Sequence, residues 1–241
     1  MQAPRKINTT LVVNPKGGSG KTTIAINLAS YFAAANIPTA LMDYDPQGSS
    51  LNWLKLRSPE APRIHGANAA PERFGRLRSF EMYVPPHVRQ LVIDAPAGAS
   101  GVLLQEMVDR ADCIIVPVVP SVIDIHASTN FIRDSLLGRI RMRQSRLAVV
   151  ANKVRRSMPR YQPLENFLQS IELKQLARLI DSDVYVRAAE SGLGIFEMEP
   201  SVSAAEQKQF RPIAEWVKGQ PLPLEPRSER VIYDLARSRT A

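Results

Sequence analysis

The sequence predicts a doubly wound α/β fold: a mostly parallel, twisted sheet with helices on both faces, followed by a helical C-terminal region. Two observations predict it. Short apolar runs of strand-forming residues alternate with longer stretches of helical spacing. The apolar runs are almost uninterrupted, as strands must be when helices cover both faces of a parallel sheet. With 241 residues, 44% of them hydrophobic and 22% charged, the chain can bury the core of one domain.

Five apolar runs mark the expected strands. They are Thr9–Val13, Thr39–Asp43, Leu91–Asp94, Cys113–Val118 and Leu147–Asn152. Helical spacing follows the first, third and fourth of these runs. Residues 55–87 are rich in proline, arginine and glycine, and we expect an irregular excursion there that carries one strand.

The chain beyond Pro200 has helical patterning. Ser203 and Glu206 have the spacing of a capping box, and Pro212 should kink the helix that follows. A proline-rich link then leads to a last short helix, which we place at Ser228–Arg239.

Composition and charge narrow the class of protein. Lysine and arginine number 31 and acidic residues 23, so the net charge is 31 − 23 = +8, which favours a polyanionic partner. The single cysteine, Cys113, excludes an internal disulfide and a thiolate cage for zinc or iron–sulfur. No signal peptide or membrane span is expected, so we predict a cytoplasmic protein. One domain should span residues 1–241, with its core in 8–200 and C-terminal helices in 201–241.

A glycine-rich loop between the first strand and a helix carries the clearest chemical signal. It reads Lys16-Gly17-Gly18-Ser19-Gly20-Lys21-Thr22-Thr23. Glycines let backbone N–H groups turn inward around a phosphate, and the helix N-terminus adds a favourable dipole. Lys21 is placed to reach the β- and γ-phosphates, and the Thr22 hydroxyl to ligate Mg²⁺. The sequence therefore predicts a nucleotide triphosphate site.

The loop resembles the deviant Walker A motif of the ParA/MinD family of P-loop ATPases. Pro15 stands where the standard motif has its first glycine, and Lys16 matches the signature lysine of that family. The resemblance implies a P-loop NTPase fold, ATP with Mg²⁺, and slow ATP hydrolysis. It also implies an ATP-bound homodimer in which Lys16 reaches the nucleotide of the second subunit. Lys16, Lys21 and one aspartate would then be the catalytic residues.

Two aspartate motifs and one asparagine extend the resemblance. Asp43-Tyr44-Asp45-Pro46-Gln47-Gly48 matches the switch motif of the family, which makes Asp45 the hydrolysis residue and Asp43 a metal-shell residue. Asp94 ends a strand that resembles Walker B and would face Mg²⁺. Asn152 aligns with the residue that recognises adenine, and the segment 187–192 resembles a nucleotide-flanking segment more weakly. Each aspartate could instead cap a helix, and Asn152 could form a turn.

A dense group of basic residues follows the fourth strand. Between Arg133 and Arg160 there are nine basic residues and one acidic residue, a charge of 9 − 1 = +8. Arginine suits phosphate oxygens, so we expect non-specific binding to duplex DNA. A solvated surface is the alternative. The residues expected to contact DNA are Arg155, Arg156, Arg160, Arg230 and Arg237.

The resemblance implies a switch that dimerises with ATP, binds nucleoid DNA and hydrolyses ATP with a stimulating partner linked to a cargo. The cargo would be a plasmid, a chromosome or a protein body such as a carboxysome or a chemoreceptor cluster. The chain before Thr9 is too short for a helix-turn-helix, so operator binding is not expected. A MinD-like membrane-associated ATPase is the alternative, although the apolar face of the last helix is thin. A metabolic ATP-dependent ligase is the third reading.

Overall fold

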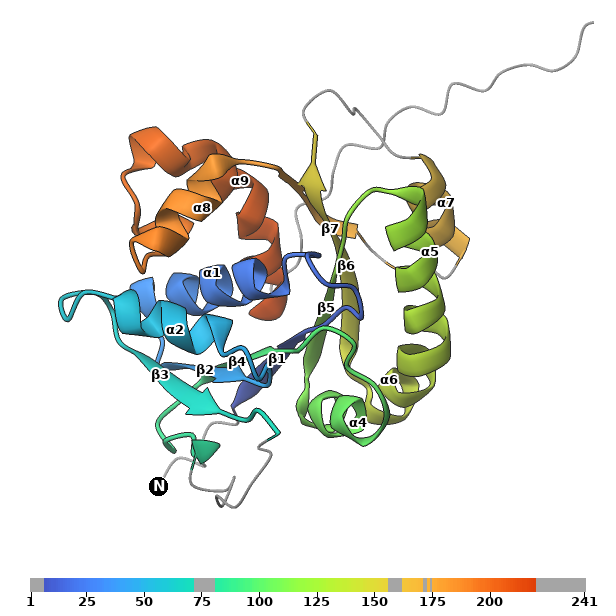
Figure 1. Ribbon diagram of the computed structural model, residues 1–241, viewed down its shortest axis with the longest axis horizontal. Coiled ribbons are helices and arrows are strands. Elements are labelled where there is room, and N and C mark those ends of the chain that lie inside the picture. The colour runs from blue at the N-terminus through green and yellow to red at the C-terminus, as the bar shows by residue number, and fades with distance from the viewer. Residues whose placement is uncertain (1–6, 72–80, 156–161, 171–172, 174, 220–241) are drawn as a thin grey trace, which may run out of the picture.

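A seven-stranded, fully parallel sheet forms the centre of the molecule. The computed structural model describes residues 7–71, 81–155, 162–170, 173 and 175–219. The strands are β1 (Asn8–Val12), β2 (Thr39–Asp43), β3 (Ile64–Asn68), β4 (Gln90–Asp94), β5 (Cys113–Val118), β6 (Arg146–Val154) and β7 (Gln175–Ile180), in the order β3-β2-β4-β1-β5-β6-β7. Each strand pairs with its neighbours in parallel (Figure 1).

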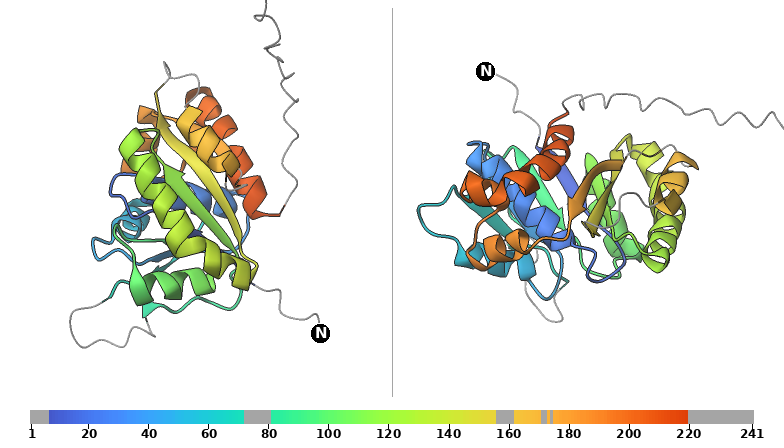
Figure 2. Two further views of the ribbon diagram at one scale, coloured as in Figure 1. Left: turned by 90° about the vertical axis from the view of Figure 1, so that its right-hand side faces the viewer. Right: turned by 90° about the horizontal axis from the view of Figure 1, so that it is seen from above.

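Helices cover both faces of the sheet, as the two turned views show (Figure 2). One face carries α1 (Lys21–Ala34), α2 (Ser49–Leu56), α8 (Asp183–Glu190) and α9 (Pro200–Val217). The other carries α4 (Gly101–Arg110), α5 (Val122–Phe131), α6 (Leu137–Arg143) and α7 (Gln162–Ser170). A π-helical turn, Ile132–Leu136, joins α5 to α6, and a 3₁₀ turn, Ile195–Glu197, precedes α9.

The alternation of side chains along the strands divides the core into two layers. In β1, Leu11 packs with Ile93 of β4 on the side of α4, whereas Val12 packs with Val92 on the side of α1. All four side chains are buried. Strands covered on both faces therefore account for the uninterrupted apolar runs of the sequence.

The predicted fold class is confirmed, and most element boundaries are close to the prediction. β2 and β5 begin and end where expected, and β3 is the one strand expected within residues 55–87. The elements that the sequence did not reveal include β7 and the helices α2, α7 and α8. The expected helix at 228–239 lies outside the described residues.

The predicted capping box in the last described helix is wrong. α9 begins earlier, at Pro200, and both Ser203 and Glu206 are buried inside it. The Ser203 hydroxyl donates to the Glu199 carbonyl over 3.2 Å, and Glu206 accepts from the Ser182 hydroxyl of the α8 N-terminus over 2.7 Å. The helix continues through Pro212 to Val217.

The strand order places a functional site at the carboxyl end of β1. β1 lies between β4 and β5, with β2, β3 and β4 on one side of it and β5, β6 and β7 on the other. Such a switch point leaves a crevice outside the strand ends, which is where open α/β sheets bind ligands. The glycine-rich loop follows β1 at this point.

Candidate nucleotide-binding site

The loop between β1 and α1 is fixed at its start by a buried asparagine. The Asn14 amide donates to the Pro117 carbonyl over 2.7 Å and to the Ser128 hydroxyl over 2.9 Å. Its Oδ1 accepts from the Lys16 N–H over 2.8 Å. These bonds hold the loop to β5 and α5, a role that the sequence motif did not reveal.

The glycines of the loop have the conformations that a phosphate cradle needs. Gly18 and Gly20 have positive φ angles of 73° and 90°. A Cβ at Gly17 or Gly18 would meet nothing within 4 Å, so both face open space. A Cβ at Gly20 would lie 2.0 Å from the Asn152 amide nitrogen, so only glycine fits there. The predicted loop residues are thus brought together as a cradle at the N-terminus of α1.

The two lysines of the loop differ in their surroundings. Lys21 is buried, and its ammonium donates to the carbonyl of Lys16 over 3.0 Å, across the loop. Burial lowers the Lys21 pKa, while Asp94 and Asp45 nearby oppose that shift. The Lys16 side chain is half-exposed, and within the described residues its ammonium makes no hydrogen bond or ion pair. Lys21 therefore belongs to its own cradle, whereas Lys16 is available to another group.

A buried pair of aspartates lies beside the cradle. Asp43 and Asp94 are register partners at the ends of β2 and β4. Both oxygens of Asp94, which is 1% exposed, have no hydrogen-bond partner among the described residues. Burial and the Asp43 charge raise the pKa of Asp94 to about 7, against the opposing influence of Thr22, Lys21 and Ser50.

These residues fit a magnesium ion held with a nucleotide. An orphaned, buried carboxylate beside a second one is costly unless a cation neutralises it. Mg²⁺ prefers oxygen ligands and keeps several waters, so it needs few protein groups. Thr22 at the start of α1 and Asp94 would hold it, with Asp43 in its outer shell.

The switch motif forms a tight turn organised by its two aspartates. Asp43 Oδ1 accepts from the Asp45 N–H over 2.8 Å, and its Oδ2 accepts from the Ser50 and Leu51 N–H groups over 3.1 and 3.3 Å. Asp45 in turn accepts from the Gln47 N–H over 2.9 Å. Asp43 therefore does cap α2, the alternative considered from sequence, while it also lies beside Asp94.

Asn152 lies against the cradle at the end of β6. It is buried, and its amide donates to the Ser19 carbonyl over 2.8 Å. The next residue, Lys153, has a positive φ of 53°, at a shift in the pairing of β6 with β7. Asn152 thus supports the phosphate loop, and its recognition of adenine stays a prediction.

Within the described residues, the arginines of the basic stretch differ in their surroundings. Arg155 is exposed at the end of β6, whereas Arg156, Arg160, Arg230 and Arg237 lie outside the described residues. Arg133 pairs with Asp134 over 2.9 Å. Arg146 is turned toward the end of α9, where its guanidinium donates to the Trp216 and Val217 carbonyls and lies over the Trp216 ring.

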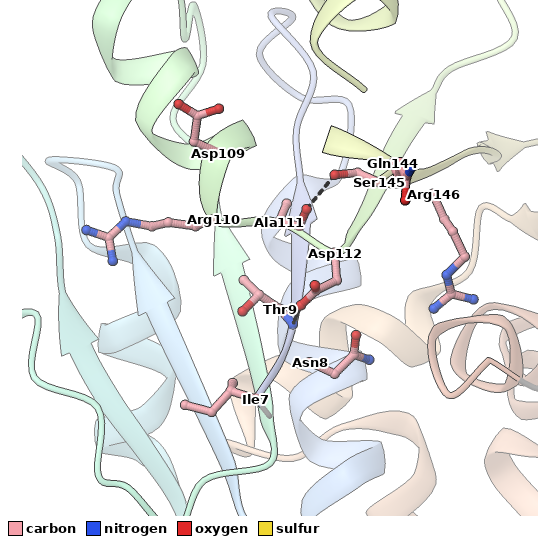
Figure 3. A pocket seen from close by; sticks show the side chains of 10 residues that line it. All are labelled: Ile7, Asn8, Thr9, Asp109, Arg110, Ala111, Asp112, Gln144, Ser145 and Arg146. Atoms are coloured by element: carbon pink, nitrogen blue, oxygen red, sulfur yellow. Dashed lines mark hydrogen bonds between the residues drawn. The ribbon is translucent and has the colours of Figure 1, made fainter. Parts of the chain in front are cut away.

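A separate hollow of about 580 Å³ opens at the amino ends of β1 and β5 (Figure 3). Two hydrogen bonds join polar groups of its lining: the Thr9 N–H donates to Asp112 over 2.9 Å, and the Ser145 hydroxyl donates to the Ala111 carbonyl over 2.7 Å. The phosphate cradle lies at the opposite edge of the sheet. This hollow is therefore not the nucleotide site.

Comparison with known proteins identifies the family. Residues 10–195 match the CobQ/CobB/MinD/ParA nucleotide binding domain. The chain belongs to this family. The match runs from within β1 to the first residue of the 3₁₀ turn before α9, and so includes the phosphate loop, both aspartate motifs and Asn152. The ParA-like resemblance seen in the sequence is thereby confirmed.

Two proteins with known names are similar to this chain in sequence. Maintenance of carboxysome distribution protein A from Halothiobacillus neapolitanus is 26% identical over 201 residues, which cover 81% of this chain and 90% of that protein. The chromosome-partitioning ATPase Soj from Thermus thermophilus is 45% identical over 41% of this chain and 54% of its own. The chain is thus similar to a protein named for carboxysome distribution and to one named as a chromosome-partitioning ATPase.

Solved structures show the same fold. The ATP complex of McdA from Cyanothece has a TM-score of 0.63 at 13% identity, covering 91% of this chain and 99% of its own. MinD in the MinC:MinD complex of Aquifex aeolicus has a TM-score of 0.66 at 17% identity, with the same coverage. In the described part of the chain, no helix is long and apolar enough to cross a membrane.

Asp94→Asn is expected to stabilise the metal-free protein at pH 8 and to remove its response to Mg²⁺. Because the folded pKa of Asp94 lies above the ordinary value of 3.8, the native state holds the extra proton. The contribution of Asp94 to wild-type stability should therefore fall as the pH rises from about 4 to about 7, by roughly 4 kcal/mol at most. Urea unfolding in EDTA at pH 5 and pH 8 measures this difference.

The exposed carboxylate Asp134 provides the control, because Asp134→Asn should leave both the pH dependence and the Mg²⁺ response unchanged. Thermal shifts with ADP, with and without Mg²⁺, complete the comparison. A metal-dependent shift of wild-type size in Asp94→Asn would show that the ion is bound elsewhere.

Proposed function

We propose that this protein is an ATP-dependent dimerising switch of the ParA type that binds DNA and positions a cargo. The proposal rests on the different contacts of the two lysines of the phosphate loop. Lys21 is folded onto its own loop, and Lys16 has an ammonium without a partner in the described residues. A cation displayed beside a cradle for a triphosphate suits a second, symmetric subunit whose nucleotide it would reach.

Exposed apolar side chains support an interface at the same edge of the sheet. Val102 lies in the first turn of α4, after β4, and Val122 and Ile123 lie in the first turn of α5, after β5. Their exposed fractions are 80%, 59% and 71%. Helices that follow parallel strands start at the carboxyl edge, which is where the phosphate loop lies. A second copy facing this edge would bury these side chains together with the nucleotides.

ATP hydrolysis in this site would depend on Asp45. Its carboxylate lies in the switch turn, near enough to Lys21 to influence the pKa of that lysine. In that position it is suited to orient an attacking water, which is the main task of the protein in phosphoryl transfer. Mg²⁺, held by Thr22 and Asp94, would neutralise charge on the β- and γ-phosphates. Hydrolysis should be slow, and a partner protein linked to the cargo should accelerate it.

DNA binding would follow from dimerisation. The exposed Arg155, together with the basic residues outside the described part, would contact phosphates without reading bases. A dimer doubles these contacts, and the second set binds at high effective concentration. The protein would then be cytoplasmic and associated with the nucleoid. Its cargo would be a DNA molecule or a protein body, and the carboxysome distribution relative makes the latter a specific candidate.

We expect the protein to be retained on non-specific duplex DNA with ATP and Mg²⁺, and released with ADP. Because the contacts are electrostatic, retention should fall steeply between about 50 and 200 mM salt. Arg155→Glu should weaken retention while dimerisation persists. Biosensor binding at several salt concentrations measures the salt dependence and the effect of Arg155→Glu on retention. Lys208→Glu, at a solvent-exposed position of α9, is the matched charge change. Equal retention with ADP and ATP would overturn the DNA-gripping part of the proposal.

The same preparation separates the alternatives. ATP-dependent binding to anionic liposomes without DNA retention would favour a MinD-like membrane ATPase instead. ATP consumption that requires a small-molecule co-substrate would favour a ligase. ATP-dependent retention on DNA, without liposome binding and without a required co-substrate, supports the proposed switch.

A further inference from the structure

The segment between α8 and α9 contacts both α1 and α2, and each of these two helices begins beside the nucleotide site. We define the linker segment as residues 192–197. On its α1 side, the Ile195 N–H donates to Asn27 Oδ1 over 2.8 Å, and the Asn27 amide donates to the Thr23 carbonyl over 2.7 Å. Thr23 lies in the first turn of α1, beside the cradle. Two consecutive hydrogen bonds therefore join the linker segment to the phosphate loop helix.

On its α2 side, the linker segment is held by a buried ion pair. Arg57, which follows the last residue of α2, makes a two-pronged contact with Glu197 at 2.6 and 2.9 Å. Both side chains are only 6% exposed. Two further N–H groups of Arg57 donate to the carbonyls of Gly192 and Pro62 over 3.0 and 2.9 Å. A buried pair with this geometry resists displacement, because breaking it leaves an uncompensated charge.

Trp53 strengthens the contact from within α2. The Arg57 guanidinium lies over its ring, 4.9 Å from the centroid. The indole N–H donates to the Leu193 carbonyl over 3.3 Å. α2 thus meets the linker segment through both an aromatic side chain and a charged one.

Two glycines let the linker segment fit between the helices. Gly192 has a φ of +66°, and a Cβ there would lie 2.5 Å from the Leu56 carbonyl carbon. A Cβ at Gly194 would lie 1.7 Å from the Ser30 hydroxyl of α1. Backbone therefore packs directly against both helices, which leaves little room for either one to shift alone.

The aspartates of the switch motif precede the other end of α2, its N-terminus. Asp43 accepts hydrogen bonds from the Ser50 and Leu51 N–H groups in the first turn of α2, and from the Asp45 N–H. A displacement of α2 along or around its axis would therefore move the donors that hold Asp43. The relation of Asp43 to Asp94, its register partner, would change with it.

We propose that Arg57 and Glu197 are positioning residues for ATP hydrolysis, which hold α2 and the switch aspartates in a fixed relation to the phosphate loop. The proposal rests on the proposed ATPase function. Neither side chain contacts the cradle, so both act through α2 and the linker segment. Nucleotide binding should depend little on them, because Asn14 and the backbone of the loop hold the cradle independently. The rate of the chemical step should depend on them strongly.

The test is the steady-state ATPase of Glu197→Gln, which keeps the size of the side chain and removes its charge. We expect kcat to fall about tenfold, since small misplacements of catalytic groups cost this much or more. The KM for ATP and the affinity for ADP should stay within about twofold of wild type. Arg57→Lys, which keeps the charge without the fork, should give an intermediate kcat.

Arg146→Ala is the matched control for lost stability. It removes a guanidinium that also bonds two carbonyls and lies over a tryptophan, but at the opposite edge of the sheet. It should lower the melting temperature without changing kcat. A kcat in Glu197→Gln no lower than in this control would overturn the proposal. So would a rise in KM with kcat unchanged, which would assign the pair to nucleotide binding.

Hydrogen exchange gives a readout that does not require turnover. In the wild type, MgATP should slow exchange at the start of α1 and at the Ser50 and Leu51 amides. In Glu197→Gln the α1 protection should remain and the α2 protection should fall at least threefold. Equal protection at both helices would overturn the positioning role. A wild type that binds nucleotide without hydrolysing it would contradict the proposed function instead, and exchange would still decide the role of the pair.

Discussion

Lys21→Ala is expected to lose at least about a hundredfold in affinity for ATP, with a folded protein remaining. The wild-type ammonium is buried at the cradle, where it would form charge-assisted hydrogen bonds to the β- and γ-phosphates. Two such bonds contribute roughly 3 kcal/mol or more, and each 1.4 kcal/mol is a factor of ten. Titration with a fluorescent ATP analogue measures the affinity.

Lys208→Ala, an exposed lysine of α9, is the control for the loss of one positive charge. It should bind the analogue like the wild type. Circular dichroism of Lys21→Ala should show an unchanged helix content, because among the described residues the wild-type Lys21 ammonium donates only to a loop carbonyl. Near-normal binding by Lys21→Ala would mean that the triphosphate lies outside the loop.

Lys16→Ala is expected to bind ATP with near-normal affinity and to remain a monomer. Its ammonium has no partner within the described residues, so its removal costs the subunit little. In the proposed dimer each copy of Lys16 reaches the nucleotide of the other copy, so the substitution removes two contacts with triphosphate at once. Light scattering after chromatography with ATP and Mg²⁺ should give a dimer for wild type and a monomer for the variant.

The two lysine substitutions therefore separate binding from assembly. The same Lys208→Ala control should dimerise normally. If Lys16→Ala instead weakened ATP binding as strongly as Lys21→Ala, both lysines would serve one nucleotide in one subunit. DNA retention should follow dimerisation and vanish in both variants.

The centre of the fold and the cradle could be predicted because their signals are local. Apolar runs identify buried parallel strands, and the carboxyl ends of such strands meet at one edge. For that reason Asp43 and Asp94, although 51 positions apart in the printed sequence, could be expected close together, and they are register partners. The loop after β1 needed no long-range information, since glycine spacing alone indicates a phosphate cradle.

The elements that sequence did not reveal depend on distant contacts. β7 carries partly exposed polar residues, so its pattern is weak, and β6 determines its place. The capping box of α9 was predicted wrongly, because Ser203 and Glu206 have capping spacing but are buried and make contacts with Glu199 and Ser182 instead. Their spacing of three residues alone does not show that the two side chains cap the helix.

The sequence shows how many basic residues a segment has, but it does not show where each side chain points. Arg146 belongs to the basic stretch, yet it serves the end of α9, 70 positions away. Arg57 and Glu197 are 140 positions apart and had no sequence signal as a pair. Only the fold brings such groups together, so polar contacts between distant residues could not be predicted from the sequence.

A structure of the protein with Mg²⁺ and a non-hydrolysable ATP analogue would show whether two subunits share their nucleotides. We expect two copies face to face, with the Lys16 ammonium of each within about 3 Å of a γ-phosphate oxygen bound by the other. An ammonium that instead points to solvent, or that contacts the triphosphate of its own subunit, would contradict this expectation.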